Sequence, residues 1–370
     1  YERPMWYAKN NEKAEYKYSF DYQNWYPSVA FETKNTITNV GLYELSPFSK
    51  YEIKGEQAHS ELQRICTANI KNEIGRSTYT QMLNEAGGIE TDLTVICIDK
   101  NHFRIISSAA TRTHDKAHIL KHLSPNLEFK DITDDLVCLG IFGPKSRNLI
   151  SKISKDDFSN EKFKFGNGKF VIIGKKKVWV QRLSYVGELG FEIYINNHDA
   201  NEIYQIIVTE GINHNLSHCG SHAMDTMRME SGFLHWGHDI SPEENQYEAG
   251  LDFAISYKKE IDFIGKESLL KIKNKKQNKR FIMLSIIDNK PGTPLLLHEE
   301  PIYLKDKIIG RTTSGNYSFN FNKNLSFGYV KSKFSNNELD KMDLYIEVAK
   351  QKYPVKVELF PLKDKHAKLL

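Results

Sequence analysis

Between residues 41 and 110, short stretches of alternating apolar and polar residues recur, with turn residues between them. Such alternation is typical of strands that bury one face. We predict strands in the two halves of Gly41–Gly55, in residues 77–88, which end in a Gly-Gly pair, and in residues 89–99 and 103–110. Glu56–Ile70 instead has helical spacing and predicts a helix, with apolar residues at Ala58, Leu62, Ile65 and Cys66.

The middle of the chain mixes both patterns. Leu136–Gly143 is a continuous apolar run that predicts a buried strand, and Pro144 follows where a first helical residue is often proline. Lys177–Ser184 and Phe191–Ile195 predict two strands joined by a glycine-containing turn. The predicted helices of this region are Asn201–Ile212 and Ser221–Glu230, both amphipathic.

The two ends of the chain differ from the middle. The first forty or so residues are rich in aromatic side chains and show no regular period, so we expect an irregular segment wrapped over a larger body. Residues 271–280 are dominated by lysine and are expected to be a solvated linker; attraction of an anionic polyglutamate tail is the minority alternative. Short strands with frequent turns from Phe281 to Leu359 predict a small, mostly β C-terminal domain.

Length, composition and charge narrow the class of protein. A chain of 370 residues is too long for one typical core, so we expect two or three compact units. With 40% hydrophobic and 26% charged residues and a net charge of +4, the chain is typical of a globular protein that does not bind nucleic acid. We find no apolar run of membrane-spanning length and no secretory signal, and the missing initial Met suggests a processed or excised chain.

The four cysteines are scattered and form no Cys-x-x-Cys pair. We expect Cys66, Cys97, Cys138 and Cys219 to be buried, reduced thiols. Reduced thiols fit a reducing compartment, which would be the cytoplasm, or the mitochondrial matrix in a eukaryote.

Most motifs of known chemistry are missing. Residues 165–174 (FGNGKFVIIG) lack the third glycine and the helix of a dinucleotide-binding fingerprint, and neither a phosphate-binding loop nor a nucleophile elbow is present, so we expect no nucleotide or flavin site. His218-Cys219-x-x-His222 and His235-x-x-His238 contain possible metal ligands without a second pair at zinc spacing. We therefore expect hydrogen-bonded histidines rather than a metal site.

Two carboxylates occupy unusual positions. Asp92 lies near the start of an apolar strand that follows the Gly-Gly turn, and Glu192 lies between Phe191 and Ile193 in another apolar strand. Burying a carboxylate is costly unless a partner compensates it. The pattern leaves two alternatives open: each charge lies on a solvent-facing side of its strand, or both face a cleft.

Several long blocks, in order along nearly the whole chain, resemble the aminomethyltransferase family, whose founding member is the T-protein of the glycine cleavage system. The similarity is closest to the folate-binding half of dimethylglycine and sarcosine dehydrogenases. The opening ERPMWYA is similar to the segment where the flavin half of those fusions ends. The other blocks are SPFSKYEIKG, YTQMLNEAGGIETDLTV, RLSYVGELGFEIYI, GSHAMDTMRMESGFLHWGHDI, NQYEAGLDFAI, DFIGKESL and GRTTSGNYSFNFNKNLSFGYV.

The resemblance implies an α+β, cloverleaf-like fold of three domains with tetrahydrofolate bound in the middle and a β-barrel at the C-terminus. Its implied division is residues 1–45 with 135–250 for the central folate-binding domain, 46–134 with 251–275 for a second domain, and 276–370 for the barrel.

The family's site residues carry over to five positions. The resemblance places Asp92 beside the reactive folate nitrogens as the catalytic group, with folate orientation alone as the alternative role, and Glu192 at the amino-pyrimidine edge of the pterin. It places Tyr79, Tyr185 and Phe253 as aromatic residues around the same cofactor. An ionised carboxylate can accept two adjacent donors of a pterin, and an Asp beside an amine can relay its proton.

The leading functional hypothesis is an enzyme that captures a methylene or iminium carbon from an oxidised N-methyl amine on tetrahydrofolate. A FAD-dependent dehydrogenase, as a separate subunit or a domain, would be its partner. Alternatives are methyl transfer from a sulfonium or quaternary ammonium donor, a glycine-cleavage T-protein, and a non-catalytic folate-binding module. Met224 stands where T-proteins usually carry Arg, which argues against a lipoyl carrier protein as donor.

Overall fold

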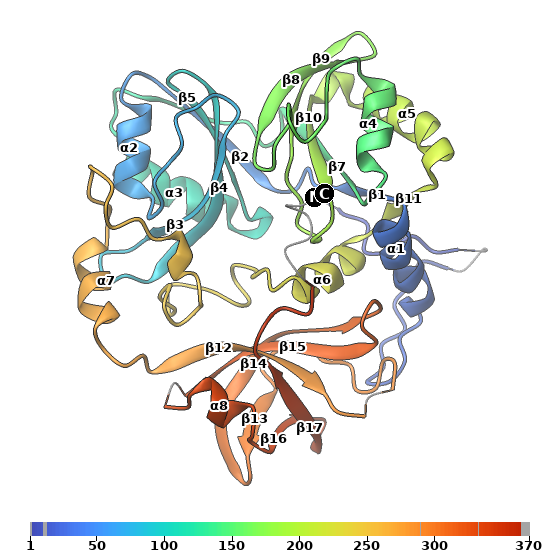
Figure 1. The fold of residues 1–370 in the computed structure, drawn as a ribbon, viewed down its shortest axis with the longest axis vertical. Coiled ribbons are helices and arrows are strands. Elements are labelled where there is room, and N and C mark those ends of the chain that lie inside the picture. Colours follow the sequence, from blue (N-terminus) through green and yellow to red (C-terminus); the bar gives the residue numbers. More distant parts are fainter. Residues whose placement is uncertain (1, 10–12, 289, 332, 364–370) are drawn as a thin grey trace.

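The computed structural model describes residues 2–9, 13–288, 290–331 and 333–363. Three β-rich units surround a central region that contains helix α6 (Ser221–Glu230) (Figure 1). They are a six-stranded sheet, a five-stranded sheet and a closed six-stranded barrel. The α+β, three-unit fold expected from the sequence is confirmed, including the C-terminal barrel.

The six-stranded sheet is assembled from both sides of an insertion. Its order is β11-β1-β7-β10-β9-β8, and only the β1–β11 pair is parallel. Its strands are β1 (Val40–Glu44), β7 (Leu136–Phe142), β8 (Gly168–Ile173), β9 (Lys176–Gln181), β10 (Gly190–Asn196) and β11 (Leu216–Cys219). The five-stranded sheet is inserted between β1 and β7 in the sequence.

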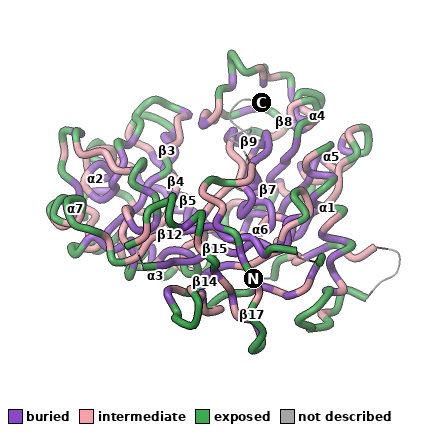
Figure 2. The backbone as a smooth tube through the Cα atoms, turned by 60° about the horizontal axis from the view of Figure 1, so that its bottom comes forward, coloured by how far each residue is buried: buried purple, intermediate pink, exposed green. Residues whose placement is uncertain are grey.

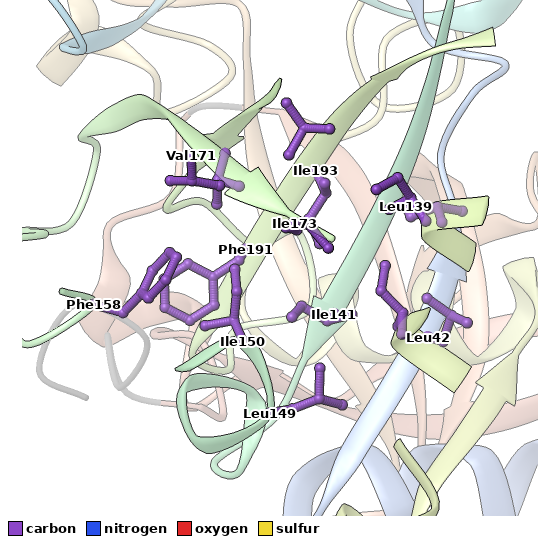
Figure 3. Close-up of a cluster of buried hydrophobic side chains, with 14 of the residues drawn as sticks. Leu42, Leu139, Ile141, Leu149, Ile150, Phe158, Val171, Ile173, Phe191 and Ile193 are labelled. Carbon is purple, nitrogen blue, oxygen red and sulfur yellow. The ribbon is translucent and has the colours of Figure 1, made fainter. Parts of the chain in front are cut away.

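Side-chain alternation gives the six-stranded sheet two different faces. One face packs apolar side chains, among them Phe191 and Ile193, against α4 (Ser146–Ile153) and α5 (Ala200–Gly211) (Figure 3). The opposite face packs Tyr43, Trp179 and Tyr194 near α1 (Tyr26–Thr38) and α6. Because successive strand residues point to opposite faces, Glu192 shares the second face with Tyr194.

The five-stranded sheet follows the same logic. Its order is β3-β4-β5-β2-β6, all antiparallel. Its strands are β2 (Ser49–Lys54), β3 (Ser77–Leu83), β4 (Ile89–Asp99), β5 (His102–Ser107) and β6 (Glu128–Asp131). Leu93, Val95 and Cys97 pack with α2 (Ala58–Ile65) and α3 (Arg112–His122) in a second core. Asp92 therefore points to the other face of this sheet.

The C-terminal barrel closes in the order β12-β15-β14-β13-β16-β17 around an aliphatic core. Its elements are β12 (Lys279–Ile286), β13 (Pro301–Leu304), β14 (Lys307–Ser318), β15 (Lys323–Lys331), the short helix α8 (Asn336–Leu339), β16 (Leu344–Val348) and β17 (Gln351–Glu358). A further cluster, including Met283 and Phe327 of the barrel and Met229 of α6, joins the barrel to the rest of the molecule. Buried residues are concentrated where these units meet (Figure 2).

One expectation about irregular segments was wrong, and a second was correct only in part. The N-terminal region contains the helix α1, whose buried face is largely polar, with Glu32, Thr33 and Thr36 enclosed. Hydrogen bonds satisfy part of this polar face, for example from Thr36 Oγ1 to the Glu32 carbonyl, whereas the Thr33 hydroxyl has no partner among the described residues. Because the buried face is polar, no apolar period marks the helix. Of the expected linker 271–280, residues 274–278 connect α7 (Lys266–Lys273) to β12, and the flanking residues belong to these two elements.

The remaining differences concern element boundaries. α2 ends at Ile65 instead of Ile70, and α4 begins two residues after Pro144. The polar helix α3 was not predicted, because Asp115 and Ile119 alone are buried on it. The six-stranded sheet draws its strands from residues 40–44 and 136–219, the five-stranded sheet from 49–131 and the barrel from 279–358, and we propose the division into domains made above on this basis.

The four cysteines are buried and unbridged, as expected from their scattered positions. Among the described helices, none combines the length and the apolar character needed to cross a bilayer.

Candidate active site

A cavity of about 920 Å³ lies where the two sheets, α6 and the barrel meet. The two sheets contribute the faces that carry polar residues, because their other faces are closed by helices. The polar and aromatic residues of the lining, together with Met224, include Lys50, Tyr79, Asp92, Tyr185, Glu192, Tyr194, His222, Asp225, Arg228, Ser314 and Asn316. The second of the two alternatives is therefore correct: both carboxylates face one cleft.

Glu192 extends into the cavity from β10 of the six-stranded sheet. Its Oε2 accepts a hydrogen bond of 2.6 Å from the hydroxyl of Tyr194, two residues further on the same face. Burial raises the pKa of Glu192, and the hydrogen bond from Tyr194 opposes that effect. A carboxylate can accept several hydrogen bonds, so Glu192 retains acceptor capacity for a ligand.

Asp92 reaches the cavity from β4 of the five-stranded sheet. Its Oδ1 accepts a 2.7 Å hydrogen bond from Nε2 of Gln81, its cross-strand neighbour on β3. Burial raises the pKa of Asp92 to about 6, against the opposing hydrogen bonds from Gln81 and Tyr79, while the charge of Asp115 adds to the increase. Asp92 therefore titrates close to neutral pH, as a general base requires.

Two of the three predicted aromatic residues line the cavity. Tyr79 lies two positions from Gln81 on β3, and the hydroxyl of Tyr185 donates a 2.6 Å hydrogen bond to the Leu234 carbonyl. Phe253 does not belong to the lining formed by the described residues: it is 74% exposed and stacks on Tyr79 with 6.2 Å between ring centroids. Phe253 therefore lies beside Tyr79 on the surface, outside the cavity lining of the described residues.

A buried ion network forms the floor of the cavity and was not predicted. Arg228 of α6 is 2% exposed and pairs with Asp225 at 2.7 Å and with Asp239 at 2.6 Å. It also donates to Oγ of Ser314 on the barrel at 2.8 Å. The sequence signal available was the Asp225-x-x-Arg228 spacing, which places both side chains on one helix face.

Lys50 is a second residue that the sequence analysis missed. It is fully buried, lines the cavity, and donates from Nζ to the carbonyls of Ser46 at 2.8 Å and Phe48 at 2.7 Å. Burial lowers the pKa of Lys50. The alternating pattern of this strand gave no sign of a buried lysine, because its charge is stabilised by backbone carbonyls of the preceding turn.

The N-terminal segment also contributes to the lining, and it contacts one of the histidine pairs considered for a metal. The Tyr16 hydroxyl lies 2.9 Å from Nε2 of His222, and the His222 ring stacks on Trp25 at 5.4 Å. Tyr204 lies 2.8 Å from Nε2 of His218. Within the part of the chain that the structure describes, no three His, Cys, Asp or Glu side chains are arranged to hold a metal ion.

Comparisons with known proteins agree with this architecture. Residues 1–259 match the GCVT N-terminal domain, and residues 279–364 match the glycine cleavage T-protein C-terminal barrel domain. A crystal structure of the glycine cleavage system aminomethyltransferase T from Bartonella henselae has the same fold, with a TM-score of 0.82 over 95% of both chains at 20% identity.

Three curated relatives illustrate the range of this similarity. Mitochondrial dimethylglycine dehydrogenase of Rattus norvegicus is 32% identical over 98% of this chain and 42% of its own length. A 4-methylaminobutanoate oxidase (formaldehyde-forming) of Paenarthrobacter nicotinovorans is 33% identical over 98% of this chain and 43% of its own length. An aminomethyltransferase of Listeria monocytogenes is 28% identical over 96% of this chain and 94% of its own length.

The chain thus spans less than half of the length of the first two relatives and nearly all of the third. Both family domains follow one another in this chain and together cover most of it. The chain therefore belongs to the aminomethyltransferase (glycine cleavage T-protein) family of folate-dependent transferases.

Proposed function

We propose that this protein takes a methylene or iminium carbon from an oxidised N-methyl amine of the dimethylglycine or sarcosine type and transfers it to tetrahydrofolate, giving 5,10-methylenetetrahydrofolate. The observation that carries the proposal is the convergence of Asp92 and Glu192, from two different sheets, on one cavity. Asp92 accepts from the Gln81 amide and is also hydrogen-bonded by Tyr79, whereas Glu192 accepts from the phenol of Tyr194.

The lining of the cavity fits a reduced pterin. Glu192 offers a carboxylate with remaining acceptor capacity, which suits the adjacent N–H donors of an amino-pyrimidine edge. Tyr79 and Tyr185 offer aromatic surface to a flat heterocycle, and the volume of about 920 Å³ lies within the range of small-molecule sites. When bound, tetrahydrofolate supplies the nitrogen nucleophiles that receive the carbon.

The chain's own residues would then divide the work. Glu192 orients the ligand, and the aromatic walls exclude water. Asp92, with a pKa of about 6, is largely ionised at neutral pH and accepts a proton at its carboxylate oxygen. Because Asp92 is half-buried, its pKa lies close to the neutral pH at which the proposed base acts.

The proposed donor follows from the names of the relatives. Two of them are named for the oxidation of N-methyl amines, and the chain matches less than half of each. We assign the two-electron oxidation of the amine to a FAD-dependent dehydrogenase, as a subunit or a domain, and the capture of the resulting carbon to this chain.

The test combines this protein with tetrahydrofolate, dimethylglycine or sarcosine, and a flavin dehydrogenase that oxidises the amine. The proposal expects the protein to increase the rate and yield of 5,10-methylenetetrahydrofolate, measured by mass spectrometry, and to decrease free formaldehyde. Equal folate product with and without the protein would reject it. Appearance of 5-methyltetrahydrofolate from a sulfonium or quaternary ammonium donor would instead select direct methyl transfer.

A glycine-cleavage T-protein is the second candidate, because the Listeria aminomethyltransferase is matched over 94% of its length. Turnover that depends on an aminomethylated lipoyl carrier protein would select it. Met224 in the cavity lining, where T-proteins usually carry Arg, argues against that donor. If the protein binds tetrahydrofolate but turns over none of these donors, it is a non-catalytic folate-binding module.

A further inference from the structure

We propose that Gln81, itself held by Gln246, is a positioning residue that fixes the Asp92 carboxylate in one orientation in the cavity wall. The catalytic part of this inference rests on the function proposed above. The geometric part concerns this chain alone. It gives a role to Gln246 of the NQYEAG segment, which is not part of the cavity lining formed by the described residues.

The three side chains form one continuous hydrogen-bonded chain. Gln81 Nε2 donates to Asp92 Oδ1 at 2.7 Å, and Gln81 Oε1 accepts from Gln246 Nε2 at 2.6 Å. Both glutamines are fully buried. Gln81 has partners on both its amide oxygen and its amide nitrogen and so has little freedom to rotate, and the carboxylate that it contacts is held as well. Gln246 uses only its amide nitrogen, and its Oε1 has no partner among the described residues.

The direction of these hydrogen bonds follows from Thr67, the second partner of Gln246. The Thr67 hydroxyl donates to the Ala254 carbonyl at 3.1 Å, so its oxygen accepts from Gln246 Nε2 at 3.1 Å. Gln246 therefore presents N–H groups to both Thr67 and Gln81. Gln81 must then present its oxygen to Gln246 and its NH₂ group to Asp92, since the reverse would set an amide oxygen against a carboxylate oxygen.

The chain of hydrogen bonds also joins two separate parts of the molecule. Gln81 and Asp92 are cross-strand partners on β3 and β4, whereas Gln246 belongs to the segment between α6 and the barrel. That segment is anchored to β4 by the hydrogen bond from the Ile89 N–H to the Glu244 carbonyl at 3.0 Å. Gln246 therefore holds Gln81 from a fixed position rather than from a loose loop.

The surroundings of Asp92 define what the loss of Gln81 should do. The ionisable groups facing Asp92 are Tyr79 on β3, Asp115 on α3 and Tyr185 in the loop before β10. Burial favours the protonated acid and so does the charge of Asp115, whereas the hydrogen bonds from Gln81 and Tyr79 favour the carboxylate. Removing the Gln81 donor should therefore shift the titration of Asp92 to higher pH.

The experiment titrates Asp92 directly in the folate-free protein. Protein labelled with ¹³C at the aspartate carboxyl carbon is followed by NMR from pH 4 to 9, and Asp92→Asn identifies the signal. Gln81→Leu is expected to raise the midpoint of Asp92 by about one pH unit, the size expected for one hydrogen bond to a charged group. Gln246→Leu should raise it by less, and Gln81→Glu by more, because a second carboxylate opposes ionisation.

The matched control is Gln63→Leu, which removes another buried glutamine of the same unit that bonds to Asn69 and Ile70. Its loss should cost comparable stability, measured by thermal unfolding, and leave the Asp92 midpoint unchanged. If Gln81→Leu does not fold, Gln246→Leu and Gln81→Glu decide the result. An unchanged midpoint in the folded variants overturns the inference.

Turnover separates this inference from the proposed function. Gln81→Leu should move the acid limb of kcat/KM upward together with the NMR midpoint, and lower kcat near pH 6 with little change in KM for tetrahydrofolate. If the substitutions shift the Asp92 midpoint but the parent protein shows no one-carbon transfer, the positioning role stands and the proposed function is refuted. Lower kcat with an unmoved midpoint would show a packing effect and refute the positioning role.

Discussion

Asp92 and Glu192 are both half-buried carboxylates in one cavity, and each is hydrogen-bonded by neutral side chains of its own sheet. Asp92 contacts a neutral amide donor, and burial raises its pKa to about 6. Glu192 contacts the phenol of Tyr194, and burial raises its pKa as well. Asp92 is also hydrogen-bonded by the phenol of Tyr79, so what distinguishes it from Glu192 is its amide partner.

Replacing Asp92 with Asn should lower kcat by about 10²- to 10⁴-fold, the usual contribution of a general base, and largely preserve tetrahydrofolate binding. In the parent protein, the base form is lost as pH falls through about 6, so kcat/KM should fall roughly tenfold per pH unit below that value. Steady-state rates between pH 5 and 8 test both statements. A variant with parental turnover would leave Asp92 with an orienting role only.

Replacing Glu192 with Gln should weaken tetrahydrofolate binding by about 10- to 100-fold, because the substitution removes a charged acceptor and introduces a competing donor. Isothermal titration calorimetry measures the change. Glu188→Gln is the matched control, since Glu188 is buried and ion-paired with Lys363 but does not belong to the cavity lining. Equal losses in both variants would indicate a general effect on folding.

At the scale of elements, the β3–β4 turn determines where Asp92 lies. Gly87 has φ +93°, which favours glycine, and a Cβ on Gly88 would lie 2.1 Å from the Pro242 carbonyl oxygen. The turn therefore packs its backbone directly against the segment that carries Gln246. Ile89 follows and donates its N–H to the Glu244 carbonyl at 3.0 Å, so the start of β4 is fixed to the same segment.

Gly88→Ala should lower the free energy of unfolding by about 1–3 kcal/mol, because one of two packed backbones must move. It should also lower kcat more than it lowers tetrahydrofolate affinity, since Asp92 moves with β4 and Glu192 does not. Urea unfolding and steady-state kinetics measure the two effects. In the control Gly250→Ala, φ is +70° with open space around the Cβ, so a similar loss of kcat there would contradict this account.

At the scale of the whole molecule, Arg228 joins α6 and the loop that follows it to the barrel. The guanidinium contacts Asp225 on its own helix, Asp239 in the following loop and Ser314 on the barrel. Asp239 accepts further hydrogen bonds from Thr313 at 2.6 Å and Ser314 at 2.8 Å. The barrel is therefore attached through a buried polar network in addition to the apolar cluster around Phe327.

Arg228→Met should destabilise the protein by about 3–5 kcal/mol, because it leaves Asp225 and Asp239 without their cation. Calorimetry should show a lower first transition, with the barrel unfolding separately. Burial alone would raise the pKa of Asp225, but Arg228 outweighs it and holds that pKa below its ordinary value. This contribution to stability is present at neutral pH and is lost as pH falls below about 4, so the gap between variant and parent should narrow in acid.

The sequence by itself determined the helices and strands whose apolar residues recur at a regular period. It also singled out Asp92 and Glu192 as carboxylates within apolar strands. Alternation in β4 and β10, the Gly-Gly turn and the apolar run of β7 each specify local structure through side-chain direction and backbone freedom. It did not reveal α1 or α3, because both helices present few apolar side chains to the core. Hydrogen bonds that satisfy a buried polar face leave no hydrophobic period to read.

Only the tertiary structure decided which side of each strand faces the cavity, and which residues complete it. Glu192 and Asp92 lie a hundred residues apart, on sheets that meet because one unit is inserted into the other. Arg228, Gln81 and Gln246 acquire their importance from partners distant in sequence. The local pattern of residues carries no information about such contacts. They form because helices cover one face of each sheet, which leaves the polar faces of the two sheets opposite one another.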